Sequence, residues 1–115
     1  MKSRRKELVE QYKQMKHDMG IFWIHCKVND KYFLETSQNL KARINREKFQ
    51  LDTGFHPNRE LQSDWKELGA ENFEIEVLEL LKYDEDNSKE DYTEELEILK
   101  YIWDEKLNKR NMKAY

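Results

Sequence analysis

Apolar residues recur in blocks along this chain, and the period of each block predicts one structural element. Residues 21–28 are rich in β-forming side chains and end at the polar bend Asn29-Asp30, after which residues 31–36 form a second such run. Residues 73–80 alternate apolar and acidic side chains, as a strand with one buried face does. The pattern therefore predicts a hairpin early in the chain and a third strand later.

Helical periodicity fills the intervals around these strands. Apolar residues at helical spacing predict amphipathic helices over residues 3–17 and 38–51, with Ser37 as the N-cap of the second. A third helix is predicted to begin at Pro57, since proline suits the first helical position. A C-terminal helix is predicted from four apolar residues on one face, Leu96, Leu99, Trp103 and Leu107.

This order of elements predicts an α/β fold, with a small three-stranded sheet flanked by helices. Residues 1–18 would add an N-terminal amphipathic helix to a single domain over residues 19–115, and residues 83–91 would form an acidic loop. No apolar run is long enough to span a membrane. The single cysteine, Cys26, cannot form an internal disulfide, which favours a reduced, cytoplasmic protein.

The net charge of −3 conceals a strong asymmetry. Residues 71–105 are mainly acidic, whereas the N-terminal segment and the second predicted helix are basic. The basic residues of that helix are Lys41, Arg43, Arg46 and Lys48. They predict a surface that contacts DNA or RNA phosphates. Two alternatives are an ordinary solvated surface, and an acidic half that binds a basic protein partner.

Several short segments together resemble the GIY-YIG endonuclease domain family, over the stretch from Met19 to the C-terminus. After the hairpin, the family has Gly-x-His-x-Asn, Leu-Gln-x-x-Trp/Phe and Gly-x-x-x-Phe patterns. The matching segments here are Gly54-Phe55-His56-Pro57-Asn58, Leu61-Gln62-Ser63-Asp64-Trp65 and Gly69-Ala70-Glu71-Asn72-Phe73. The resemblance implies the family fold: a three-stranded sheet with flanking helices.

The resemblance also implies a set of catalytic positions. The family cleaves phosphodiester bonds with one divalent metal, a metal-binding glutamate on the last helix, two tyrosines from the hairpin and an arginine that stabilises phosphate charge. Arg43 and His56 retain family positions. Five residues depart from the pattern: Phe22, Phe33, Glu35, Glu47 and Lys100. The two phenylalanines lack the tyrosine hydroxyls, and a lysine stands at the position of the metal-binding glutamate.

Other readings of the retained and neighbouring residues stay open. Arg43 can pair with Glu47 one helical turn later, and His56 can simply cap the helix that follows it. Tyr32 should face the opposite side of its strand from Phe33, so its hydroxyl cannot replace the missing one. Trp23, Trp65 and Trp103 have spacings typical of core residues.

These departures predict a nuclease-like protein that has lost catalysis and binds nucleic acid or another anionic partner. No metal ligand set and no cofactor are expected, apart from Mg²⁺ if residual activity exists. The alternatives are a metal-dependent endonuclease with residual phosphodiester hydrolysis, and a protein-interaction or regulatory module.

Overall fold

The computed structural model describes residues 16–85 and 89–115. The predicted N-terminal helix falls mainly on residues 1–15, outside the described residues. The elements follow the predicted order: β1 (Gly20–Cys26), β2 (Tyr32–Ser37), α2 (Leu40–Thr53), α3 (Arg59–Leu68), a 3₁₀ turn (Ala70–Asn72), β3 (Phe73–Leu80) and α4 (Thr93–Lys109). No helix among the described residues has the length and apolar character needed to cross a membrane.

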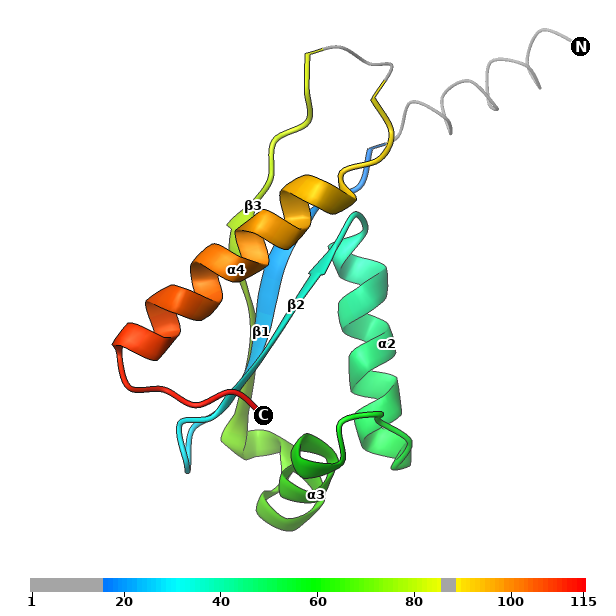
Figure 1. Ribbon diagram of the computed structural model, residues 1–115. Helices are drawn as coiled ribbons and strands as arrows, with labels where there is room; N and C mark the ends of the chain where they lie inside the picture. Colours follow the sequence, from blue (N-terminus) through cyan, green and yellow to red (C-terminus); the bar gives the residue numbers. More distant parts are fainter. Residues whose placement is uncertain (1–15, 86–88) are drawn as a thin grey trace, which may run out of the picture.

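The sheet is antiparallel, with strand order β2-β1-β3. The central strand β1 pairs with both neighbours, so that Ile24 lies opposite Phe33 of β2 and Ile75 of β3. Helix α4 lies across one face of the sheet, and α2 and α3 lie on the other (Figure 1). Because helices cover both faces, β1 is almost continuously apolar rather than alternating.

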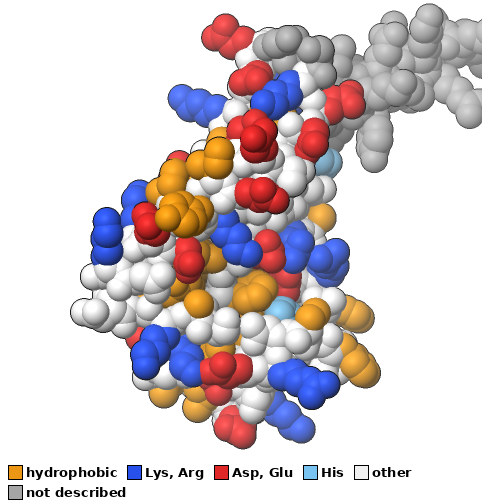
Figure 2. All heavy atoms as spheres, viewed as in Figure 1, with side chains coloured by type: hydrophobic (Ala, Val, Ile, Leu, Met, Phe, Trp, Pro, Cys, Tyr) orange, Lys and Arg blue, Asp and Glu red, His pale blue; other side chains and the backbone are white. Residues whose placement is uncertain are grey.

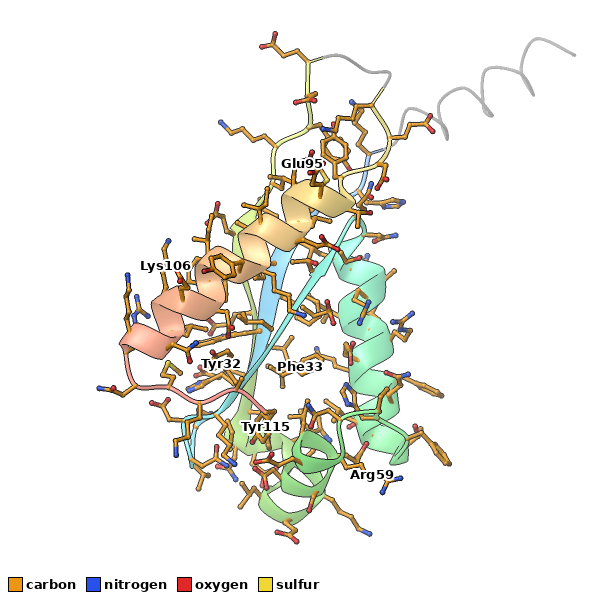
Figure 3. All side chains as sticks on the ribbon, in the orientation of Figure 1. Tyr32, Phe33, Arg59, Glu95, Lys106 and Tyr115 are labelled. Carbon is orange, nitrogen blue, oxygen red and sulfur yellow. The ribbon has the colours of Figure 1, made fainter. Side chains whose placement is uncertain are left out.

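Each face of the sheet carries its own hydrophobic cluster. Ile21, Tyr32 and Leu34 pack with the α4 leucines, whereas Phe22 and Ile24 pack with residues of α2 and α3. The predicted opposition of Tyr32 and its neighbour Phe33 is confirmed: Tyr32 lies on the α4 side and Phe33 points toward α2 (Figure 3). Cys26 is buried and free, and all three tryptophans pack against one of the two clusters.

Two predicted helix starts are wrong by two residues. Asn39, not Ser37, caps α2, because the Asn39 side chain accepts a hydrogen bond from the backbone N–H of Ala42. The Ser37 hydroxyl instead accepts from the backbone N–H of Asn39 and closes the preceding turn. Likewise α3 begins after Asn58, whose side chain accepts from the N–H of Leu61 at 3.0 Å, so Pro57 precedes the cap.

The C-terminal tail continues the sheet beyond β2. Ala114 forms a parallel bridge with Tyr32, and the backbone N–H of Tyr115 donates to the Tyr32 carbonyl. The Tyr115 hydroxyl reaches Asp64 of α3 at 2.7 Å, and the Tyr32 hydroxyl donates to Asp104 of α4 at 2.6 Å. The two phenols therefore fasten the tail and the hairpin to different helices.

We expect these two tyrosines to ionise late in an alkaline titration. Burial, and secondly the hydrogen bonds to Asp104 and Asp64, raise the pKa of Tyr32 and of Tyr115 well above the ordinary value. Because the unfolded chain releases those protons near pH 10, stability should fall as the pH rises above about 10. Absorbance at 295 nm should show a late phase that Tyr32→Phe and Tyr115→Phe each reduce; an unchanged late phase in both variants would contradict the assignment.

Candidate functional site

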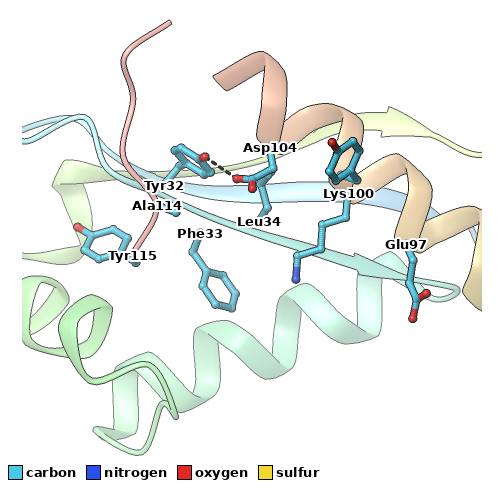
Figure 4. Close-up of a pocket in the computed structure, with 9 residues that line it drawn as sticks. Tyr32, Phe33, Leu34, Glu97, Lys100, Asp104, Ala114 and Tyr115 are labelled. Atoms are coloured by element: carbon cyan, nitrogen blue, oxygen red, sulfur yellow. Dashed lines mark hydrogen bonds between the residues drawn. The ribbon is translucent and has the colours of Figure 1, made fainter. Parts of the chain in front are cut away.

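A groove runs between α2 and α4 over the β2 strand, and we call it the α2–α4 groove. Three adjoining hollows of about 450, 370 and 470 Å³ compose it. The first two share Phe33, the second and third share Glu35 and Arg43, and the first and third share Glu97 and Lys100. Figure 4 shows Lys100 reaching from α4 toward α2, with Phe33 beside it. The two retained family positions thus meet four of the five departing ones in this groove, whereas Phe22 is buried in the core and lines none of the three hollows.

Helix α2 contributes a charged pair to the groove, in which Glu47 is buried and Arg43 is partly exposed. Arg43 and Glu47 lie one turn apart, and the Arg43 Nε atom donates to Glu47 Oε1 at 2.9 Å. The second oxygen of Glu47 accepts from His56 Nε2, and both of these side chains are almost wholly buried. The predicted pairing of Arg43 with Glu47 therefore forms, but as part of a partly buried cluster in which Glu47 and His56 are buried, rather than as a fully exposed ion pair.

The surroundings of His56 fix its proton. The backbone N–H of Asn58 donates to His56 Nδ1 at 3.0 Å, so that nitrogen carries a lone pair and not a hydrogen. The proton lies on Nε2 and is donated to Glu47, and the Phe33 ring packs edge-on against the imidazole at 5.4 Å. From the sequence alone, His56 could have capped α3. In the structure the cap is Asn58 instead. Both imidazole nitrogens are occupied within the protein.

Glu35 connects the two sides of the groove. Its Oε2 atom lies 3.2 Å from an Arg43 terminal nitrogen, and its Oε1 atom lies 3.8 Å from Lys100 Nζ. The same Oε1 accepts a hydrogen bond from the backbone N–H of Thr36 at 3.1 Å. One carboxylate therefore bridges a cation from α2 and a cation from α4.

The charges within this cluster balance. Two cations, Arg43 and Lys100, face two carboxylates, Glu35 and Glu47, while His56 is neutral. Among residues 16–85 and 89–115, no group of three or more histidine, cysteine or acidic residues is placed to hold a metal ion. Glu35 and Glu47 each already bind a cation or an N–H donor, and the Lys100 ammonium lies in the same groove, so this cluster does not fit the divalent metal that the family resemblance implies.

The structure brings some of the predicted binding residues together and separates others. Arg43, Arg46 and His56 line the same hollow of the groove. Lys41 and Lys48 lie on other sides of α2, where each lines a different hollow. The predicted set of four basic residues is thus not one continuous surface. Figure 2 shows basic and acidic side chains interspersed over the face that carries α4.

Sequence reasoning treated Glu35 and Lys100 as two separate departures and missed that they meet. The signal available was their opposite charge: a carboxylate appears on the strand where the family has glycine, and a cation appears on the helix where it has glutamate. Arg46 was predicted to bind nucleic acid as part of a basic helix, but its place beside Pro57 and Asn58 required the fold.

The antiparallel β2-β1-β3 sheet, with α4 on one face and α2 and α3 on the other, is the fold of GIY-YIG nuclease domains. The catalytic domain of the homing endonuclease I-TevI has this fold: its structure matches with a TM-score of 0.66 and 23% sequence identity, over 84% of this chain and 96% of that chain. A single-residue variant of the same I-TevI domain matches with a TM-score of 0.66 and 21% identity, over 85% of this chain and 92% of that one.

No protein-family model matches the sequence, and neither does any curated protein. At 21–23% identity, the likeness to the two solved structures shows the fold alone. What the chain does must therefore be inferred from the chemistry of the α2–α4 groove.

Proposed function

We propose that this chain binds nucleic acid, or another anionic partner, in the α2–α4 groove without cleaving it. One observation carries the proposal: the two retained family residues are both engaged by Glu47, which stands at a departing position. His56 has no free nitrogen to accept a proton from water, and the Arg43 guanidinium is held by two carboxylates. The groove keeps cations suited to phosphate but lacks a poised base.

The first test asks whether the chain is an enzyme. Supercoiled plasmid incubated with the protein and Mg²⁺ or Mn²⁺ should remain uncut, because Phe22 and Phe33 carry no hydroxyl and Lys100 would repel a metal ion. Nicking by the wild-type protein that disappears in the Arg43→Ala variant would contradict this expectation and favour the alternative of a residual endonuclease.

The second test asks whether the groove binds nucleic acid. Arg46 is exposed, lines the groove and, among the described contacts, makes no ion pair with Glu35 or Glu47. Arg46→Ala should therefore weaken binding of a fluorescent DNA oligonucleotide about two- to fivefold. The slope of log affinity against log salt concentration should also become shallower, by about the amount that one phosphate contact contributes. Fluorescence anisotropy at low ionic strength measures both quantities.

Lys48→Ala is the matched control, since Lys48 is an exposed cation of the same helix outside the groove. We expect its affinity and salt dependence to equal those of the wild-type protein. Equal losses in the two variants would show that binding follows net charge and not the groove. Absence of wild-type binding to both DNA and RNA at low salt would overturn the proposed function.

A further inference from the structure

We propose that Glu35 is an internal competitor for the anion site of the α2–α4 groove and determines which anions bind there. This inference rests on the proposed function and names the residue that controls it. The Glu35 carboxylate stands between Arg43 and Lys100, at 3.2 and 3.8 Å from their nitrogens. A phosphate oxygen bound to both cations would need the same space.

The carboxylate is held there by three donors. Besides the two cations, the Thr36 backbone N–H donates to it, and the Glu35 side chain is only 22% exposed. Because the Glu35 carboxylate is part of the chain, its contact with Arg43 and Lys100 costs no translational entropy. It therefore competes with an external anion for these two cations at a high effective concentration. A singly charged ligand gains little by displacing it, whereas a ligand with more charge or several contacts can do so.

The position of Lys100 supports the same conclusion. Its side chain is 47% exposed and extends toward the groove rather than away into solvent (Figure 4). The 3.8 Å separation from Glu35 is an ion contact and not a close hydrogen bond. Lys100 can therefore exchange Glu35 for an external anion by a small movement, while Arg43 remains fixed by Glu47.

Glu35→Gln tests the inference, and Glu97→Gln is its matched control. Both substitutions remove one negative charge from the same groove, but no ion pair joins Glu97 to Arg43 or Lys100 among the described contacts. Glu35→Gln should tighten binding of a fluorescent DNA oligonucleotide about fivefold. The slope of log affinity against log salt concentration should steepen by about 0.7 to 0.9 for each new phosphate contact, and we expect one to two such contacts. Glu97→Gln should change affinity less than about twofold.

A second measurement does not depend on nucleic acid. Inorganic phosphate should raise the unfolding temperature of Glu35→Gln more than that of Glu97→Gln or the wild-type protein, because a ligand that binds only the folded state stabilises it. In the double variant Glu35→Gln/Lys100→Gln, both the tighter DNA binding and the larger phosphate-induced rise in unfolding temperature should disappear. The unfolding curves themselves show whether each variant is folded.

The outcomes separate this inference from the proposed function. Equal behaviour of Glu35→Gln and Glu97→Gln in both assays overturns the competitor role, whether or not the wild-type protein binds DNA. If only the Glu35→Gln protein binds DNA or phosphate, the competitor role stands and the proposed function of the wild-type chain fails. If no variant binds either ligand, both fail.

Discussion

Replacing Glu47 with alanine should lower the free energy of unfolding by about 3 kcal/mol, as expected when one partner of a buried charged cluster is removed. The carboxylate is 3% exposed and binds Arg43 through one oxygen and His56 through the other. Arg43 would keep its contact with Glu35, but the imidazole Nε2–H would lose its acceptor inside the protein. Urea denaturation followed by circular dichroism measures the loss.

Glu47→Gln keeps the size of the side chain but removes its charge and one of its two acceptor oxygens. An amide can still accept from Arg43, but its NH₂ group would then face the Nε2–H of His56, and His56 cannot switch tautomer while Asn58 donates to its other nitrogen. We expect a cost of about 1–3 kcal/mol for this unsatisfied contact. If Glu47→Gln is as stable as the wild-type protein, the proton assignment for His56 is wrong.

The exposed pair of Lys31 and Glu60 supplies the control. It joins the β1–β2 bend to α3, and half of the Glu60 side chain is exposed. Glu60→Ala should cost less than about 1 kcal/mol, because solvent already screens both charges. A similar loss in Glu60→Ala and Glu47→Ala would mean that burial does not govern the stability of the groove cluster.

Much of the fold could be predicted because its signals are local. The alternation of apolar and acidic residues over 73–80, broken only where Val77 and Leu78 are adjacent, predicted β3 with the bounds that the structure shows. The hairpin strands were placed to within two residues, because the polar bend between them is unmistakable. The helix starts were less certain, since Ser37 and Asn39 both suit a cap and only the backbone path decides between them.

The site was harder to predict, because its contacts join distant parts of the chain. Family positions located Arg43 and His56, and one-turn spacing suggested the pair with Glu47. The contact between Glu35 and Lys100 depends on α4 lying across the sheet beside β2, which no local pattern encodes. The burial of Glu47 also has no sequence signal, since a glutamate on a charged helix is ordinarily exposed.

Gly20→Ala should be among the most destabilising single changes in the hairpin, with a loss of about 3 kcal/mol or more in the free energy of unfolding. A Cβ atom at Gly20 would lie 2.1 Å from the Glu79 carbonyl oxygen and 2.9 Å from the Leu80 Cα. Both atoms belong to the backbone of β3, so no side chain can rotate to make room. Relief requires β1 and β3 to separate next to the register shift at Ile21 and Phe22. Urea denaturation gives the size of the loss.

Gly54 provides a control that separates strain from collision. Both glycines have positive φ, +156° at Gly20 and +85° at Gly54, but a Cβ atom at Gly54 would meet nothing within 4 Å. Gly54→Ala should therefore cost only about 1 kcal/mol, the conformational penalty at a left-handed helix end. A Gly20→Ala loss no larger than this would show that β3 moves aside easily. The larger loss would show that close approach of the two backbones requires glycine at the start of β1.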